Sequence, residues 1–236
     1  MKAPETRLSI GGLTPFSTVD YPGKLAAVVF CQGCALRCSY CHNPHLQKRS
    51  GTGRGTLWSE VLGFLEERRG MLDAVVFSGG EALLQPGLPA AVDEVAALGF
   101  AVGLHTAGLS PKRLDRALGA LSWVGFDVKA PFDEYDRVGS AKAGRLARAS
   151  LERLLESGVD HEVRMTVHGP HVGRRAALWA MAALPAMGVK RFALQQARRP
   201  GRLLDVLDDD RVFSDSGLID GLKAAFPEVV IRRYDA

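Results

Sequence analysis

Short runs of apolar and β-branched residues alternate with helical patterns along almost the whole chain of 236 residues. Such runs, separated by helical segments, are typical of strands in a parallel sheet. The expected strands are Leu25–Phe30, Ala74–Phe77, Phe100–Leu104, Trp123–Val128, Glu162–Val167 and Phe192–Leu194. Six βα units in one run predict a parallel sheet with right-handed crossovers.

The segments between the strands carry apolar side chains at helical spacing. One set is Leu57, Val61, Phe64 and Leu65, and a second set is Ala147, Leu151, Leu154 and Leu155. Each set falls on one face of a helix, and charged residues occupy the opposite face. We expect Thr56 and Ser110 to cap the starts of helices, because hydroxyl side chains accept from free amides there. Glycines at positions 70, 99, 158 and 188 are expected to end helices.

Polar side chains recur on one face of several expected strands. One such row is Glu162, Arg164, Thr166 and His168, a second is Asp127 and Lys129, and His105 ends a third strand. Strands that are buried on both faces would be apolar throughout, so these rows predict a concave face that holds a ligand. Six units are too few for an eight-stranded barrel. We therefore predict an α/β fold with parallel strands, a partial (β/α)6 barrel, rather than an open doubly wound sheet. That the polar residues merely satisfy one another remains the alternative.

No linker or repeat interrupts the pattern, so we expect one domain over residues 1–236. In it, residues 1–24 lead into the first strand and residues 25–236 form the core. Apolar residues make up 47% and charged residues 24% of the chain, which excludes a mainly disordered protein. The net charge of +4 comes from scattered arginines, so we expect no nucleic-acid partner. The apolar stretch Ala176–Val189 contains Pro185 and is too short to span a membrane. These features predict a cytoplasmic protein without a membrane partner.

All four cysteines lie between positions 31 and 41, spaced Cys31-x2-Cys34-x3-Cys38-x2-Cys41. A disulfide scaffold would spread its cysteines along the chain, so this cluster indicates a metal or redox site. Four-thiolate zinc sites generally separate their two cysteine pairs by a longer loop, and three residues is too tight. Three cysteines at this spacing suit a cubane iron–sulfur cluster, whose fourth iron is then open to another ligand.

The motif Cys34-x3-Cys38-x2-Cys41, with Tyr40 before the last cysteine, resembles the signature of the radical S-adenosylmethionine (SAM) superfamily. The stretches Ser17–Lys24 and Cys41-His42-Asn43-Pro44 are similar to those of glycyl-radical-enzyme activating proteins. The motif Asp-Tyr-Pro-Gly-Lys at residues 20–24, and the Gln-Gly pair directly before Cys34, most resemble those of the anaerobic ribonucleoside-triphosphate reductase activating proteins. The similarity extends from about Ile10 to the last expected strand.

This resemblance implies a [4Fe-4S] cluster bound by Cys34, Cys38 and Cys41, with SAM at the open iron. Tyr40 and His42 would line the cofactor side of the loop. Cys31 is expected to be a buried structural thiol, and His45 to be solvated.

Further along the chain, Gly79-Gly80-Glu81 resembles the element that grips the methionine amino group of SAM, and Thr106 is assigned to the same cofactor. Glycines allow a backbone to approach a ligand, and a carboxylate complements an ammonium group. The bland interpretation is an ordinary strand-to-helix turn.

Asp127 and Lys129 resemble an Asp-x-Lys element that approaches the ribose and carboxylate side of SAM. The bland alternative is an ordinary ion pair. Arg164 would complement the SAM carboxylate, and Gln195 would contact the adenine or ribose, unless it only caps the sheet. His105 stands where the activating enzymes usually show aspartate, so we assign no monovalent-cation site; His105 is expected to contact the ligand or to mark a diverged target.

The resemblance implies reductive cleavage of SAM to a 5′-deoxyadenosyl radical, which takes a hydrogen from a glycine Cα of a partner enzyme. The implied partner is an anaerobic ribonucleotide reductase, and the electron donor is flavodoxin- or ferredoxin-like. No residue beyond the cluster and SAM is expected to be catalytic. Two alternatives remain: a radical SAM enzyme acting on a small molecule or a peptide, and a noncatalytic zinc-binding interaction module. The basic stretch Arg198–Arg202 is either a partner contact or a solvated turn.

Overall fold

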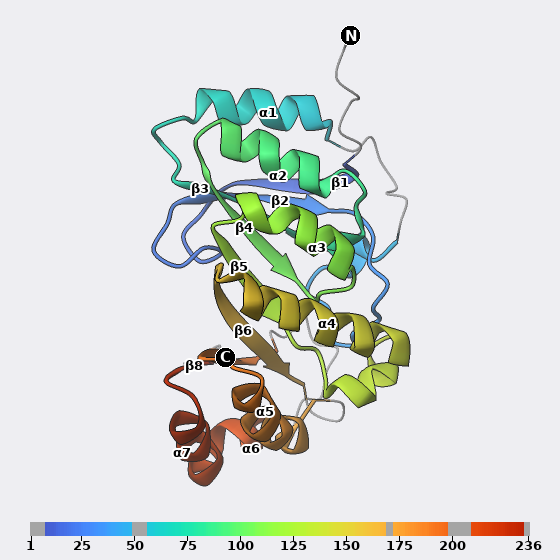
Figure 1. Cartoon of the computed structure of the whole chain (residues 1–236), viewed down its shortest axis with the longest axis vertical. Helices are drawn as coiled ribbons and strands as arrows, with labels where there is room; N and C mark the ends of the chain where they lie inside the picture. The colour runs from blue at the N-terminus through green and yellow to red at the C-terminus, as the bar shows by residue number, and fades with distance from the viewer. Residues whose placement is uncertain (1–7, 49–55, 169–171, 198–208, 234–236) are drawn as a thin grey trace.

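A computed structural model describes residues 8–48, 56–168, 172–197 and 209–233 of the chain. Its strands form one sheet in the order of the sequence (Figure 1). The strands are β1 (Ile10–Ser17), β2 (Ala26–Cys31), β3 (Ala74–Gly79), β4 (Ala101–Thr106), β5 (Trp123–Asp127), β6 (Asp160–Val167), β7 (Arg191–Gln196) and β8 (Glu228–Arg232).

The six strands expected from the sequence correspond to β2–β7, and their ends differ from the prediction by at most two residues. All six pair in parallel, which confirms the partial barrel. Two strands were not expected. β1 pairs antiparallel with β2, and β8 pairs parallel with β7. Residues 1–24 are therefore more than a lead-in, because Ile10–Ser17 form an edge of the sheet.

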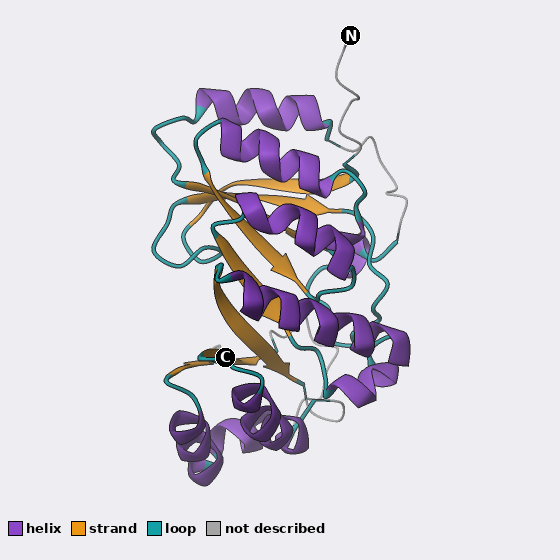
Figure 2. Ribbon diagram, viewed as in Figure 1, coloured by secondary structure: helices purple, strands orange, loops and turns teal. Residues whose placement is uncertain are grey.

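The helices lie on one side of the sheet (Figure 2). Their bounds are α1 (Trp58–Glu67), α2 (Leu88–Ala97), α3 (Pro111–Ala117), α4 (Ala141–Ser157), α5 (Arg174–Ala186), α6 (Asp209–Ser214) and α7 (Ser216–Ala225), with short 3-10 turns η1 (Pro44–Leu46), η2 (Ala82–Leu84), η3 (Leu118–Ala120) and η4 (Phe132–Arg137). Right-handed crossovers between strands in sequence order place successive helices on the same face. The opposite face is left free to become the concave interior.

Helix ends follow the sequence signals in part. Gly158 ends α4 with φ of 72°, a left-handed conformation that favours glycine. The expected cap at Thr56 is wrong, because Thr56 pairs with Ile10 in an isolated bridge and α1 starts one residue later, after Leu57. Ser110 does precede α3, but its side chain makes no capping hydrogen bond.

The two faces of each strand enter different environments. In β2, Ala27, Val29 and Cys31 pack in the large core beneath the helices. Ala26 and Val28 point the other way, into a smaller cluster with Tyr21 and Trp123. This alternation is the period of two expected of a strand. The polar rows of the later strands share the inner face with Trp123.

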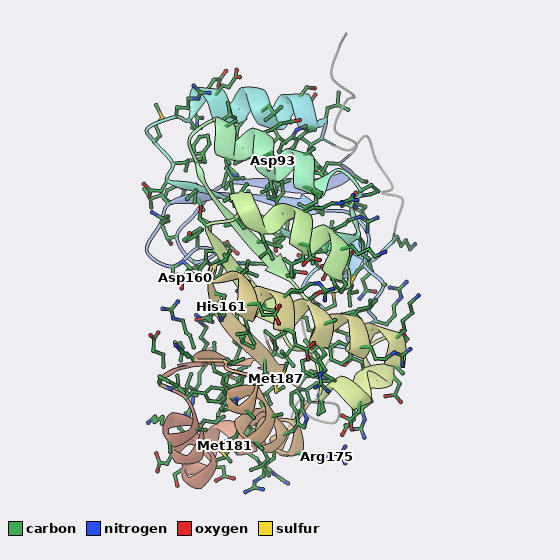
Figure 3. The ribbon with its side chains drawn as sticks, in the orientation of Figure 1. Asp93, Asp160, His161, Arg175, Met181 and Met187 are labelled. Carbon is green, nitrogen blue, oxygen red and sulfur yellow. The ribbon has the colours of Figure 1, made fainter. Side chains whose placement is uncertain are left out.

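Ion pairs join the last three strands near their amino ends. Arg191 of β7 pairs with Asp160 of β6 at 2.8 Å and with Glu228 of β8 at 2.6 Å. Figure 3 labels Asp160 and its neighbour His161 at the beginning of β6. These pairs are solvent-exposed and each contributes little to stability. Within the described residues, no helix is long and apolar enough to cross a membrane.

Candidate functional site

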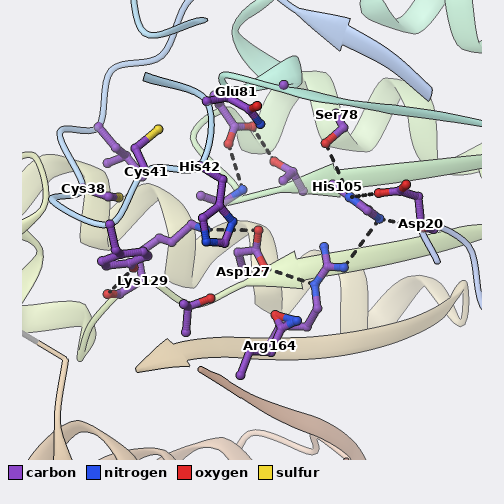
Figure 4. Close-up of a pocket in the computed structure, with 18 of the residues that line it drawn as sticks. Asp20, Cys38, Cys41, His42, Ser78, Glu81, His105, Asp127, Lys129 and Arg164 are labelled. Carbon is purple, nitrogen blue, oxygen red and sulfur yellow. Dashed lines mark hydrogen bonds and ion pairs between the residues drawn. The ribbon is translucent and has the colours of Figure 1, made fainter. Parts of the chain in front are cut away.

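A cavity of about 890 Å³ opens on the concave face, where the carboxyl ends of the parallel strands meet. Ligand sites of open parallel sheets and barrels usually lie at this end. All thirteen site residues expected from the sequence line the cavity: Cys34, Tyr40, Cys38, Cys41, His42, Gly79, Gly80, Glu81, Thr106, Asp127, Lys129, Arg164 and Gln195. Figure 4 shows several of them converging from different strands. Their roles toward a ligand stay predictions.

The loop between β2 and α1 presents the three cysteines to this cavity. It is held on both sides by main-chain hydrogen bonds. Gly33 N donates to Leu46 O at 2.7 Å, and Arg37 N donates to Val138 O at 2.7 Å. The first bond closes the loop on itself, and the second fastens it to the end of η4. The cysteine positions are thus held before any ligand arrives.

Gln32 supports the same loop and was missed by sequence reasoning. Its side chain is buried, and its amide nitrogen donates to His45 O at 3.1 Å and to Lys48 O at 2.7 Å. The side-chain amide of Gln85 in turn donates to the main-chain oxygen of Gln32. The available sequence signal was the glutamine of the Gln-Gly-Cys stretch. His45 itself is exposed, as expected.

The thiols differ in their surroundings. Burial raises the pKa of Cys34 to about 11, and burial also raises the pKa of Cys38 against the opposing charge of Lys129. Iron binds thiolates, so loading a cluster here must release protons. Cys31 points away from the cavity, into the core beneath the helices, and is fully buried. Its placement agrees with the expected structural role.

The donor set fits an iron–sulfur cluster. Within the described ranges, no three histidine, cysteine, aspartate or glutamate side chains are gathered closely enough to hold one metal ion. Cys34, Cys38 and Cys41 nevertheless line one cavity. Separate thiols around a common space are what a cluster needs, since each binds a different iron.

Gly79 and Gly80 bring β3 against the start of the cysteine loop. Gly79 has φ of 109°, and a Cβ there would lie 2.5 Å from the main-chain N and O of Cys31. A Cβ on Gly80 would lie 2.7 Å from the carbonyl carbon of Gly33. We expected the glycines to admit a ligand. The structure shows that both glycines also approach the chain itself, at Cys31 and Gly33, and their approach to a ligand stays a prediction.

Glu81 is a buried carboxylate at the wall of the cavity. It accepts hydrogen bonds from Ala107 N at 2.8 Å, from Leu83 N at 3.2 Å and from the hydroxyl of Thr106. Burial raises the pKa of Glu81, while these hydrogen bonds oppose the rise. Thr106 therefore orients Glu81, besides lining the cavity itself.

Asp127 lies between two cations. Its carboxylate is 3.1 Å from Lys129 Nζ and accepts from Arg164 Nε at 3.0 Å. Burial alone would raise the pKa of Asp127, but Arg164 and Lys129 hold it well below its usual range. The ordinary ion pair of the alternative interpretation, between Asp127 and Lys129, is thus present. Asp127, Lys129 and Arg164 all line the cavity as well.

Gly125 makes room for the Arg164 guanidinium. A Cβ at this glycine would lie 2.5 Å from Arg164 Cζ and 2.8 Å from Nη1. Nη2 of Arg164 donates to Gly125 O at 3.0 Å, and the guanidinium lies over the Trp123 ring, 5.8 Å from its centroid. The guanidinium of Arg164 already bonds Asp127 and Gly125 O, so a SAM carboxylate would have to bind the same group beside these partners.

His105 bonds the chain itself. Its Nε2 lies 2.7 Å from Asp20 O, and its Nδ1 lies 3.4 Å from Ser78 Oγ (Figure 4). Burial and the charge of Arg164 lower the pKa of His105 to about 3, so the ring is neutral at pH 7 and donates to Asp20. The Asp-Tyr-Pro-Gly-Lys stretch therefore reaches the cavity, which Asp20 and Pro22 line. Tyr21 of the same stretch packs on Trp123, with ring centroids 5.2 Å apart.

The unexpected strand β8 supplies part of the wall. Arg232 makes two hydrogen bonds, 2.7 and 2.8 Å long, to the carboxylate of Glu162 across the inner face of β7. The β-branched run that precedes Arg232 was the signal for this strand. Gln195 and Gln196 line the cavity from the end of β7, and His42 lies exposed at its rim. The basic stretch Arg198–Arg202 lies outside the described residues.

The model of the radical SAM superfamily matches residues 28–175, which is more than half of the chain. A putative glycyl-radical enzyme activating enzyme of Methanocaldococcus jannaschii is 36% identical over 132 residues, covering 53% of this chain and 52% of that protein. A pyruvate formate-lyase-activating enzyme of Clostridium pasteurianum is 40% identical over 102 residues, or 42% of this chain and 41% of that protein. The chain thus matches about half the length or less of these relatives.

Among solved structures, QueE from Escherichia coli superposes with a TM-score of 0.59 and 19% identity, covering 96% of this chain and 94% of that one. This likeness concerns the fold alone. The family match implies a [4Fe-4S] cluster and SAM as cofactors, in agreement with the three cavity cysteines. The chain belongs to the radical SAM superfamily.

Proposed function

We propose that this chain is a glycyl-radical-enzyme activating enzyme whose partner is an anaerobic ribonucleoside-triphosphate reductase. One observation carries the proposal: three cysteine thiols, a buried carboxylate and two cations line a single cavity at the carboxyl ends of the strands. Such a cavity holds a cluster and a zwitterionic cofactor side by side.

Cys34, Cys38 and Cys41 would hold the cluster, which leaves one iron for SAM. When bound and reduced, the cluster supplies the electron that cleaves SAM to methionine and a 5′-deoxyadenosyl radical. Glu81 is placed to accept the methionine ammonium, because its carboxylate is buried and already oriented by three hydrogen bonds. Lys129 offers its ammonium to the carboxylate side of the ligand.

The protein's contribution is orientation and exclusion of water rather than proton transfer. Arg164 holds Asp127 in place through a hydrogen bond of 3.0 Å, and Asp127 positions Lys129 at 3.1 Å. Gln195 at the end of β7 would contact the ribose or adenine. The partner would contribute the glycine whose Cα hydrogen is removed.

Two findings support a glycyl-radical enzyme as the partner. Both curated relatives described above are named as activating enzymes of this class. The Asp-Tyr-Pro-Gly-Lys stretch most resembles activators of anaerobic ribonucleotide reductases. Its residues Asp20 and Pro22 line the cavity, and His105 bonds the main chain of Asp20. A flavodoxin- or ferredoxin-like protein would supply the electron.

The test is electron paramagnetic resonance of anaerobic mixtures of reconstituted protein, SAM, reductant and candidate partner. We expect a glycyl doublet with ribonucleotide reductase, and its collapse when the partner carries Cα-deuterated glycine. Deuterium should then appear in 5′-deoxyadenosine. A partner with its radical glycine replaced by alanine is the matched control. Formation of 5′-deoxyadenosine with a small metabolite or a peptide, together with no glycyl signal with any glycyl-radical enzyme, would contradict the proposal.

A further inference from the structure

Tyr135 is a fully buried tyrosine that none of the roles above uses. It lies in η4, the short turn that connects β5 to α4. Its hydroxyl oxygen accepts the main-chain N–H of Lys129 at 3.1 Å. On the other side of the same residue, the hydroxyl of Tyr40 donates to Lys129 O at 3.4 Å. The main chain of Lys129 is therefore held by two phenols from different parts of the fold.

A helical glycine allows Tyr135 to reach this position. A Cβ on Gly144 of α4 would lie 3.0 Å from the carbonyl carbon of Phe132 and 3.1 Å from the Cβ of Tyr135. Any larger residue at position 144 would push η4 away from α4, and the phenol of Tyr135 would move with it. The close approach is thus built into two elements rather than into Tyr135 alone.

The same turn also holds the cysteine loop. Leu36 from that loop packs with Tyr135 and Val138 in a small apolar cluster, against which Cys34 and Cys38 lie. The bond from Arg37 N to Val138 O fastens the loop to this turn. One segment therefore sets both the cysteine loop and the main chain of Lys129.

The location of the Lys129 ammonium in the cavity depends on how the main chain of Lys129 is held. The ammonium lies 3.1 Å from Asp127 and lines the cavity (Figure 4). The positive charge of Lys129 also acts to lower the pKa of Cys38, against the effect of burial. The ammonium stands on a flexible side chain, so its location depends on where the main chain is held. Lys129 also follows the end of β5, where the ladder of the sheet no longer fixes its amide. The phenol of Tyr135 takes over that part.

We propose that Tyr135 is a positioning residue, whose hydroxyl fixes the main chain of Lys129 so that the ammonium meets the carboxylate side of SAM. This inference rests on the proposed function only in so far as the cavity binds SAM. The identity of the partner does not enter it.

The test uses Tyr135→Phe, which removes the hydroxyl and keeps the ring in its cluster. Without any cofactor, hydrogen exchange of the Lys129 amide should accelerate, because its acceptor is lost. In the reconstituted protein, SAM should bind about three- to tenfold more weakly, the change expected for one buried hydrogen bond. Iron content should not change, and the melting temperature should fall by about 2–4 °C.

A second background separates positioning from a general structural effect. In Lys129→Met protein, Tyr135→Phe should not weaken SAM binding further, because the ammonium through which it acts is gone. The matched control is Trp58→Phe, which removes the partly buried hydrogen bond from Trp58 to Glu94 in the helical layer. It should leave the affinity for SAM unchanged.

Unchanged exchange at Lys129, unchanged SAM affinity in Tyr135→Phe, or an equal loss in the Lys129→Met background would each overturn the proposal. Failure of the wild-type protein to form a glycyl radical would overturn the proposed function instead, and SAM binding that depends on Tyr135 would survive that result. The two failures are therefore distinguishable.

Discussion

Substitution of Gly125 by alanine probes the most crowded point of the inner face. The new Cβ would lie 2.5 Å from Arg164 Cζ and 2.8 Å from Nη1, whereas ordinary contacts begin at 3.4 Å. The guanidinium must therefore move by about 1 Å, which breaks its bonds of 3.0 Å to Asp127 and to Gly125 O. Small shifts of the alanine cannot relieve this, because Gly125 lies within β5.

The cost follows from those two hydrogen bonds. A hydrogen bond to a charged group contributes about 1.5–3 kcal/mol, and alanine in place of glycine returns about 0.5–1 kcal/mol through the unfolded chain. Asp127 keeps Lys129 as a partner, so it is not left as an unpaired buried charge. We expect a net loss of about 2–5 kcal/mol, or a melting temperature lower by about 4–20 °C.

Urea and thermal unfolding followed by circular dichroism measure this loss. Gly12→Ala is the matched control in a strand, because nothing lies within 4 Å of a Cβ there. It should be neutral or slightly stabilising. In an Arg164→Met background, Gly125→Ala should cost less than about 0.5 kcal/mol, since the colliding group is absent. An equal loss in both backgrounds, or no loss in the wild-type background, would refute the reasoning.

Three further substitutions test other parts of the site. Glu81→Gln should destabilise the fold by about 1–3 kcal/mol and weaken SAM binding at least about tenfold by equilibrium dialysis, because an amide donor would face the groups that now donate to the carboxylate; unchanged affinity would remove Glu81 from the binding site. The pKa of His105 is about 3 in the folded chain against an ordinary 6.5, so only the unfolded chain takes up this proton as the pH falls through 6.5. Stability should therefore drop from pH 6.5 toward pH 3, and His105→Gln should flatten the drop in urea midpoints; an identical profile would contradict the low pKa. Gly80→Ala should lower iron content after reconstitution by displacing the cysteine loop, with Gly63→Ala in α1 as a control that has no atom within 4 Å; full iron loading would contradict this role.

The sequence predicts the parallel strands well because apolar runs alternate with helical patterns along the chain. It misses β1 because Ile10–Ser17 contains two glycines and Pro15, residues that are depleted in strands. Such a strand is tolerated at the edge of the sheet, where one side needs no hydrogen-bonding partner. It also misses β8, although the β-branched run Val229-Val230-Ile231 was visible in the sequence.

The candidate site could be predicted as far as local spacing defines it. The cysteine spacing and the polar residues at strand ends are visible in the sequence, and all the expected residues line one cavity. Contacts between distant segments are not visible. Tyr40 reaches Lys129 from 89 residues earlier in the chain, and Arg232 reaches Glu162 only through the unexpected strand.

The expectation for His105 shows the same limit. His105 lines the cavity, so its contact with a ligand stays a prediction, but the sequence did not reveal its bond to the main chain of Asp20, 85 residues earlier. Arg164 likewise finds its main partners in Asp127 and Gly125 O. In both cases burial makes a polar group bond whichever neighbour the fold supplies, and that neighbour depends on tertiary packing.

The most direct measurement is iron content and SAM cleavage after anaerobic reconstitution of four single cysteine-to-alanine variants. Cys34→Ala, Cys38→Ala and Cys41→Ala should each lose the cluster and form no 5′-deoxyadenosine. Cys31→Ala should keep both, because this thiol packs in the core beneath the helices. Loss of the cluster in Cys31→Ala, together with a full cluster and SAM cleavage in any of the other three, would contradict the assignment of the site.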